Sequence, residues 1–331
     1  MRAESSGELA VESSEFSADR RPEAAFDAHR CWPPTTDYRR LTKPGEQTDD
    51  LAPAGSEFPR NVSVVTLAWN EGVNIRRALQ SVSGANDRVV VDSGSTDATA
   101  AIAVEEGARV FKHGFVTSSG QRQWALENVP FANKWVFVLD ADEWVPRSLA
   151  AEVAALVERG DFAAAAARTR IVYEGRWIPR STLYPSWTVR LLNRDRVRYE
   201  NRSVNAHPEA DGPILQMSSD VVHEDLKSLS LRVRKLERYA RLEAVETQRW
   251  AGSPLQAVRQ AKTLRRRIKV IHSLLPLRAT AKAVVLLARG GAFEGRAGWH
   301  FVEESWHQER LTARYVRELR AQTRGDSTVA E

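Results

Sequence analysis

Residues 135–142 read WVFVLDAD, and this stretch decides the fold class. Its apolar run is short, is followed at once by acids, and is typical of a strand buried on both faces of a parallel sheet. Because side chains alternate along an extended chain, Asp140 and Asp142 leave the strand on the same side. We therefore predict a buried strand that presents two carboxylates at its carboxyl end.

The segments around this strand repeat its pattern. Short apolar runs at 63–68, 88–92 and 108–111 alternate with helical patterns near 75–82, 97–106 and 146–158. Such alternation predicts an α/β fold with a mostly parallel sheet and helices on both faces. Ligands of these sheets bind beyond the carboxyl ends of the strands, where strand order reverses. The polar residues expected there are Asn70, Glu71, Asp92, Asp140 and Asp142.

An Asp-x-Asp pair at a strand end suits a divalent cation. Mg²⁺ and Mn²⁺ prefer oxygen ligands and take one or two carboxylates together with phosphate oxygens of a substrate. Taken alone the pair is a weak signal, because similar pairs are common in solvated turns. Its weight comes from the motifs that surround it.

Composition narrows the class of protein. The 331 residues are 42% hydrophobic and 27% charged, and no apolar run is long enough to cross a bilayer. The single Cys31 excludes an internal disulfide, and the N-terminus lacks a secretory pattern, so we expect a cytoplasmic protein. Residues 1–60 are acidic, rich in proline and without periodicity, which predicts disorder.

The sequence pattern of residues 251–331 predicts a basic, amphipathic helical tail. Residues 259–293 contain nine Lys or Arg and no acid, with Leu264, Ile268, Ile271 and Leu275 at helical spacing. Such a helix suits the inner face of the cell membrane, where anionic lipids attract it. The alternative is a basic helical hairpin that packs on the catalytic domain.

Four motifs together resemble a known family: TLAWNE (66–71), VVVDSGSTDAT (89–99), SSGQRQWAL (118–126) and VFVLDADEW (136–144). In this order and spacing they resemble the inverting family-2 glycosyltransferases of the GT-A fold, in particular the bacterial β-1,4-glucosyltransferase-like subgroup of lipopolysaccharide core and exopolysaccharide synthesis. The resemblance implies a UDP- or GDP-sugar donor, a divalent metal, and a glycan or polyprenol-linked acceptor. It covers residues 61–250, with a nucleotide-binding half (61–145) and an acceptor half (146–250).

The resemblance also implies roles for single residues. Glu71 and Asp92 match the contacts to base and ribose, Asp140 matches the acid that faces ribose or diphosphate, and Asp142 matches the metal ligand. Arg122 falls where a guanidinium pairs with phosphate oxygens. For Asp97, which opens a predicted helix, capping is a sufficient explanation.

An inverting transfer also needs a carboxylate that takes the acceptor proton. The candidates are Glu224 and Asp225, followed by Glu209, and His223 is a possible metal ligand. Relatives often carry a His-Glu pair where this chain reads Asn205-Ala206, so the sequence leaves the base open among these acids.

Residues 175–190 combine aromatic and cationic side chains, and we expect them to form a wall for the acceptor or the donor sugar: Trp177, Tyr184, Trp187 and Arg190. Core packing is the plainer explanation for some of them. A nucleic-acid groove would use the same residue types, but the clustered carboxylates would repel a phosphate backbone, so we expect no nucleic-acid partner.

Two other functions remain in view. A nucleotidyltransferase would also bind a nucleotide and Mg²⁺, but it usually carries a Gly-rich loop with a lysine after the first strand, and AWNEGVN (68–74) has neither. A catalytically silent nucleotide-binding module is the other alternative, because fold alone does not establish activity.

Overall fold

The computed structural model describes residues 48–115, 117–182, 184–199, 208–260, 264–275 and 277–329. All of these residues belong to one contact unit, Thr36–Glu331, and the other unit, Met1–Thr35, lies outside the described residues. The described structure therefore bears on the disorder predicted for residues 1–60 only from residue 48 onward.

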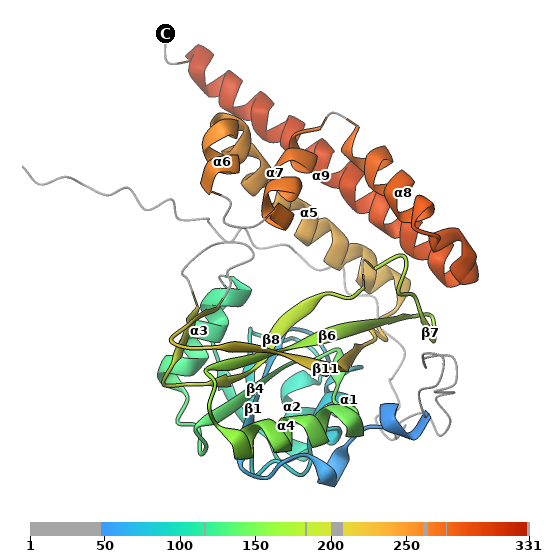
Figure 1. Ribbon diagram of the computed structural model, residues 1–331. Helices are drawn as coiled ribbons and strands as arrows, with labels where there is room; N and C mark the ends of the chain where they lie inside the picture. The colour runs from blue at the N-terminus through green and yellow to red at the C-terminus, as the bar shows by residue number, and fades with distance from the viewer. Residues whose placement is uncertain are drawn as a thin grey trace, which may run out of the picture. The chain divides into compact units, whose positions relative to one another are not determined.

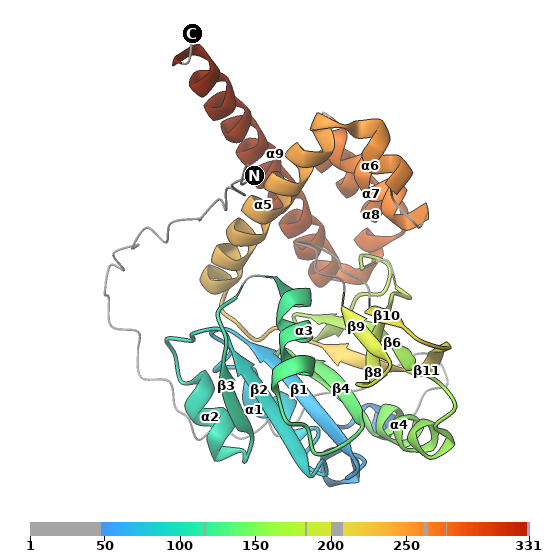
Figure 2. The same ribbon diagram turned by 90° about the vertical axis from the view of Figure 1, so that its left-hand side faces the viewer.

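Four parallel strands form the half of the sheet that the sequence predicted. Figure 2 shows them side by side in the order β3-β2-β1-β4, with bounds Arg109–Lys112, Asp87–Asp92, Val62–Ala68 and Trp135–Asp140. β2 and β4 pair with opposite edges of β1. The register aligns Asp92 with Ala68 and Asp140 with Leu67, so both aspartates stand level with the carboxyl end of β1.

The other half of the sheet contains antiparallel pairs, several short strands and one long strand that the sequence did not predict. β8 (Trp187–Asn193) pairs with β4 and is followed by β6 (Ala164–Tyr173), β11 (Ile214–His223) and β5 (Glu143–Trp144). β7 (Arg176–Trp177) pairs with β6, while β9 (Val197–Tyr199) and β10 (Pro208–Ala210) form a separate ribbon. β11 is the long unpredicted strand. Because it pairs His223 with Glu143, it carries the chain back to the Asp-x-Asp motif.

Helices cover both faces of the sheet. α1 (Ile75–Gln80), α2 (Thr99–Glu105) and α4 (Arg147–Arg159) lie on one face, and α3 (Ser118–Asn128) lies on the other. Alternation along β1 divides the core, because Val64 packs with α1 and α4 whereas Val65 packs with α3. The predicted α/β class, with parallel strands at its centre, is confirmed.

The C-terminal part is helical, as predicted, and Figure 1 shows its helices together. Its elements are α5 (Leu229–Gly252), α6 (Pro254–Gln260), α7 (Leu264–Leu274), α8 (Arg278–Ala288), the 3₁₀ turn η4 (Gly291–Glu294) and α9 (Gly295–Val329). α5 lies alongside α9 in both ribbon views. In the described part of the chain, no helix is long and apolar enough to span a membrane.

The face of α5 that packs against α9 carries small side chains. Ala240 and Ala244 pack against α9, while the larger Tyr239, Leu242 and Val245 are exposed. Small side chains allow two long helices to approach closely, and this is why the larger apolar residues point elsewhere.

Residues 48–58 are ordered and packed, which differs from the disorder expected up to residue 60. They form two short 3₁₀ helices, η2 (Thr48–Leu51) and η3 (Gly55–Glu57). The side chains of Leu51 and Phe58 are almost fully buried, and the Phe58 ring meets that of Phe137 edge-on, with centroids 5.8 Å apart. Trp144 donates its indole N–H to the Leu51 carbonyl at 3.2 Å. The prolines therefore bend this segment over the core rather than leaving it free.

Removing the Phe58 ring should destabilise the protein. Phe58→Ala should lower the free energy of unfolding by about 3–5 kcal/mol, the usual cost of deleting a buried phenyl ring. The matched control is Phe293→Ala, because Phe293 is 79% exposed and Phe58 only 2%. Urea unfolding followed by circular dichroism measures both. Equal midpoints for the two variants would show that residues 48–58 add nothing to the core.

Candidate active site

The carboxyl ends of β1 and β4 meet where the strand order reverses. β2 continues the sheet on one side of β1 and β4 on the other, and this is the place where parallel α/β sheets bind ligands. Glu71 lies in the loop after β1, Asp140 ends β4, and Asp142 follows two residues later. The predicted acids therefore converge on one edge of the sheet.

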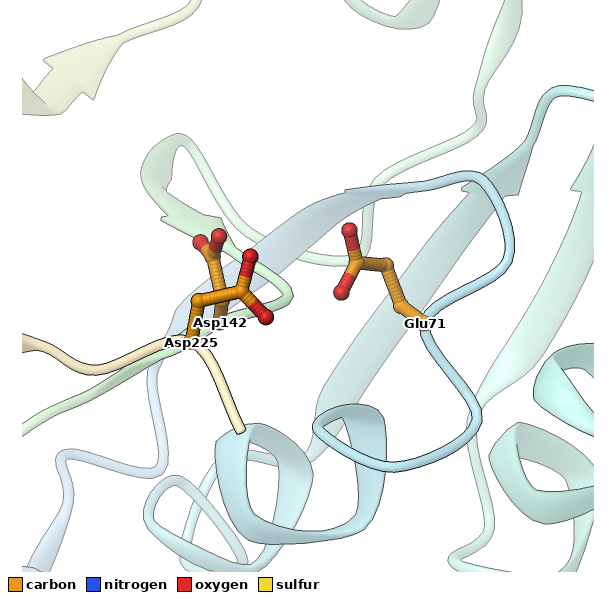
Figure 3. A group of neighbouring side chains, drawn as sticks. All are labelled: Glu71, Asp142 and Asp225. Atoms are coloured by element: carbon orange, nitrogen blue, oxygen red, sulfur yellow. The ribbon is translucent and has the colours of Figure 1, made fainter. Parts of the chain in front are cut away.

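Three carboxylates from distant parts of the chain form an acidic cluster: Glu71, Asp142 and Asp225. One oxygen from each lies within 4.8 Å of the oxygens of the other two. Figure 3 shows Asp142 and Asp225 side by side, with Glu71 facing them from the loop after β1. Glu71 and Asp142 are buried and Asp225 is half-buried. Three convergent hard oxygen donors fit a cation of the Mg²⁺ or Mn²⁺ type.

Two lysines and one asparagine hold this cluster together. Lys235 of α5 contacts Oδ2 of Asp142 at 3.1 Å and Oδ2 of Asp225 at 3.0 Å. Lys227 pairs with Glu71. Asn74 donates to Glu71 at 2.8 Å and to Asp225 at 3.0 Å. The negative charge of the cluster is therefore offset within the chain.

His223 completes the surroundings of Asp142. Its Nδ1 lies 3.2 Å from Oδ1 of Asp142. Burial would raise the pKa of Asp142, but His223 and Lys235 outweigh it and hold that pKa well below its usual range. Burial would likewise lower the pKa of His223, yet Asp142 raises it to about 9. Because a metal binds neutral imidazole, ligation by His223 would first require loss of this proton. Its role as a metal ligand stays a prediction.

Burial acts on the pKa values of Glu71 and Lys235 in opposite directions, because it disfavours the charged form of each. Burial raises the pKa of Glu71, with Asp142 adding to the effect and Lys227 opposing it. For Lys235, burial would lower the pKa, but the carboxylates of Asp142 and Asp225 raise it above its ordinary value. The ammonium of Lys235 is thus firmly charged in this arrangement.

Arg190 lies beneath the Asp-x-Asp motif rather than in an aromatic wall. It donates to Oε1 of Glu143 at 2.6 Å and to Oδ2 of Asp140 at 3.3 Å. Arg122 of α3 donates to Oδ1 of Asp140 at 3.1 Å. It therefore lies next to the acid that is predicted to face the ribose or the diphosphate. Burial raises the pKa of Glu143 to about 7, although Arg190 opposes it. Two arginines thus fix the first acid of the motif.

The three candidates for the base occupy different environments. The carboxylate of Glu224 accepts from Arg77 at 2.6 Å, and Arg77 also lies over the Trp144 ring. Asp225 belongs to the acidic cluster. Glu209 lies in β10, in the separate ribbon with β9, and is not part of the cluster. The stretch that contains Asn205 and Ala206 lies outside the described residues.

The loop after β1 is bound by the turn after β2. The backbone N–H groups of Asn70, Glu71 and Gly72 donate to side chains of that turn: Ser95 at 2.9 Å, Thr99 at 2.8 Å and Asp97 at 3.0 Å. These amides are therefore already used and do not form a cradle for phosphate.

Asp92 and Asp97 both act within this turn. Asp92 is buried and accepts from the N–H groups of Gly94 and Ser95, at 3.2 and 3.1 Å. Asp97 accepts from the N–H of Thr99 at 3.0 Å, which agrees with the capping explanation. The predicted contact between Asp92 and the nucleotide base stays a prediction.

The aromatic segment packs largely against its own part of the sheet. The rings of Trp177 and Tyr184 meet edge-on with centroids 5.3 Å apart, and Arg170 lies over Trp177 at 4.6 Å. The Tyr184 hydroxyl donates to Asp220 at 2.9 Å. Trp187 is 39% exposed. Trp177 and Tyr184 are half-buried and contact each other, Arg170 and Asp220, while the predicted sugar contact of all three aromatic residues stays a prediction.

Four residues of the site were missed by sequence reasoning: Asn74, Arg77, Lys227 and Lys235. Lys227 stands in VVHEDLK beside the predicted acids, so its position gave a signal. Lys235 lies on a helix with many basic residues, and nothing in its local pattern distinguishes it.

Comparison with known proteins agrees with this geometry. Residues 63–210 match the family described as "Glycosyl transferase family 2". An "Uncharacterized glycosyltransferase RC0292" of Rickettsia conorii is 38% identical over 93 residues, which cover 28% of this chain and 32% of that protein. The "Lipopolysaccharide core biosynthesis glycosyltransferase LpsC" of Rhizobium meliloti is 32% identical over 93 residues, which cover 27% and 34%. The match spans about a third of the length of these relatives.

Solved structures resemble the chain only distantly. The mannosyltransferase PcManGT of Pyrobaculum calidifontis, in complex with GDP-Man and Mn²⁺, has a TM-score of 0.41 at 15% identity, covering 84% of this chain and 91% of its own. TarS 1–349 of S. aureus has a TM-score of 0.38 at 14% identity, covering 78% and 91%. At these TM-scores the likeness carries no argument about this chain. Residues 63–210, which run from β1 to β10, thus match the glycosyl transferase family 2 over less than half of the chain.

Proposed function

We propose that the protein is an inverting, metal-dependent glycosyltransferase that takes a sugar from a UDP- or GDP-linked donor. One observation carries the proposal: a cluster of three carboxylates stands at the strand-order reversal of a family-2 domain. A nucleotidyltransferase is less well supported, because the backbone amides after β1 are bound to the turn after β2 and offer no phosphate cradle.

The acidic cluster would hold the cation through Glu71, Asp142 and Asp225. A Mg²⁺ or Mn²⁺ ion bound there would offset the negative charge that develops on the departing nucleotide diphosphate. Arg122 stands next to Asp140 on α3, where its guanidinium can also reach donor phosphate. Asp140 is held by Arg122 and Arg190 and would contact the ribose or the diphosphate.

We assign the base to Glu224. Asp225, the other favoured candidate, belongs to the metal cluster, and Glu209 lies in a separate ribbon. Glu224 is adjacent in sequence to that cluster, and Arg77 orients its carboxylate. A base oriented by a third group is the usual arrangement in proton abstraction.

Loss of Asp142 should abolish metal-dependent turnover and leave the fold intact. Asp142→Ala removes a cluster oxygen, so release of UDP or GDP from a donor panel should fall to background with Mn²⁺ present. Asp161→Ala is the control, because Asp161 is an exposed acid whose pairing partner is Arg159 on the surface. Full activity in Asp142→Ala, or in wild type with excess chelator, would remove the metal from the mechanism.

Substitutions of the two neighbouring acids, Glu224 and Asp225, should have different effects. Glu224→Gln should lower turnover by roughly 10²–10⁴ without changing Mn²⁺ affinity, the usual contribution of a general base. Asp225→Asn should weaken Mn²⁺ affinity instead. Steady-state kinetics and direct Mn²⁺ titration measure the two effects. Unchanged turnover in Glu224→Gln would transfer the role to Asp225 or Glu209.

We further propose that the C-terminal helices dock on an anionic membrane surface, at the inner face of the cell membrane, where the acceptor is a glycan linked to a polyprenol or another lipid. Large apolar side chains are exposed on α7 and α8, between these two helices, in η4 and at the start of α9: Ile268, Ile271, Leu275, Leu277, Val284, Val285, Phe293 and Trp299. Exposed apolar residues among cations are typical of an interfacial helix.

The basic run contributes less charge than the sequence suggests. Lys269 pairs with Glu243 of α5, while Arg278 and Lys282 both pair with Glu309 of α9. The alternative of a packed basic hairpin thus holds for part of the run. Arg259, Arg267 and Arg289 remain exposed, whereas the side chains of Arg265 and Arg266 lie outside the described residues.

Vesicle flotation tests the docking proposal. Wild type should bind anionic vesicles at low salt and leave them at high salt. The double variant Ile268→Asp, Ile271→Asp should lower the partition coefficient roughly tenfold or more, since burying each aliphatic side chain contributes about 1.5–3 kcal/mol. Val104→Asp on α2 is the control, because Val104 is equally exposed but far along the chain from this surface. Undiminished binding of the double variant would contradict the proposal.

A further inference from the structure

A lysine ammonium stands between two of the three cluster carboxylates. Lys235 lies 3.1 Å from Oδ2 of Asp142 and 3.0 Å from Oδ2 of Asp225. In Figure 3 these two carboxylates are the adjacent pair that faces Glu71. The side chains of Asp142 and Asp225 are only 10% and 13% exposed, so little water reaches this contact. Lys235 is a cation that these two carboxylates share.

The same two carboxylates belong to the acidic cluster that would hold a divalent cation. A metal ion of the Mg²⁺ type requires its carboxylate oxygens at about 2.0–2.1 Å, whereas the ammonium binds them at hydrogen-bond distance. An ammonium and a doubly charged ion cannot share one pair of oxygens, because steric overlap and like-charge repulsion both oppose it. Occupancy by one excludes the other.

Lys235 differs from the other cations of the site in its origin. Lys227 and His223 flank the acids in the segment that leaves β11, and Lys227 contacts Glu71 rather than the adjacent pair. Lys235 comes instead from α5, the first of the C-terminal helices, which packs against α9. Like Lys227 and His223, Lys235 lies outside residues 63–210, but of these three cations it is the one that stands on a helix.

We propose that Lys235 is a built-in counter-cation that occupies the place of the divalent ion, so that metal binding requires its withdrawal. The inference rests on the proposed metal-dependent function and deepens it. It makes α5 a regulator of the site, because any shift of this helix changes how easily the ammonium leaves. In the absence of metal, the same contact keeps the buried acids compensated.

Direct Mn²⁺ binding, measured by the loss of free-ion paramagnetic resonance without any donor present, tests the inference. Lys235→Met keeps the length of the side chain and removes its charge, so the Kd for Mn²⁺ should fall about tenfold or more. Lys235→Arg keeps a competing cation and should stay within about threefold of wild type. Lys282→Met is the matched control, because Lys282 is 33% exposed and Lys235 31%, and its partner Glu309 lies outside the site. The control should leave the Kd unchanged.

A second measurement uses the wild-type protein alone. Mass spectrometry after brief lysine acylation should show that Mn²⁺ increases the labelling of Lys235 several-fold and leaves Lys282 unchanged. This readout does not depend on the folding of any variant.

The outcomes distinguish the inference from the proposed function. Equal Mn²⁺ affinity of wild type and Lys235→Met, or constant labelling of Lys235, would overturn the inference and leave the metal site standing. Failure of Mn²⁺ to bind either protein, or undiminished binding by Asp142→Ala, would overturn the metal site and with it the inference.

Discussion

Three carboxylates lie within 4.8 Å of one another at the end of the central strands, and two of them are buried. Like charges this close, largely out of water, repel strongly and lose hydration. The arrangement persists because Lys227 and Lys235 supply compensating charge at hydrogen-bond distance or closer. The rest of the site depends on this compensation, since an uncompensated cluster would separate or take up protons.

Buried arginines compensate further carboxylates outside the acidic cluster. Arg190 binds Glu143 and Asp140, Arg77 binds Glu224, and Arg170 binds Asp220 within the sheet at 2.7 Å. A planar guanidinium holds a carboxylate in a fixed orientation, and its charge is not lost at any physiological pH. An arginine therefore positions each of these four acids, Glu143, Asp140, Glu224 and Asp220. Such rigidity is what a site needs to hold a reacting group in place.

The candidate site extends beyond the segment that matches the family. Glu71 and Asp142 lie within residues 63–210, but Asp225 follows β11 and Lys235 belongs to α5. The unpredicted strand β11 joins the two regions by pairing with β5 next to the Asp-x-Asp motif. A second added segment, residues 48–58, packs Phe58 against Phe137 from the opposite end of the chain. Elements outside the matched segment thus complete the sheet and its core from both ends of the chain.

The sequence by itself determined the parallel half of the sheet and the acids Glu71, Asp92, Asp140 and Asp142 at its edge. Local periodicity carries this information, because a buried strand must be apolar and must end where polar residues begin. Only the tertiary structure decided that Asp225 and Lys235 join them. Lys235 pairs with Asp142, which lies 93 positions earlier in the chain, and with Asp225, which lies 10 positions earlier. Ion pairs between such separated residues leave no periodic pattern in the sequence. β11 escaped prediction for a related reason: its polar residues are satisfied by neighbouring side chains, such as Asp220 by Arg170, and this satisfaction exists only once the chain is folded.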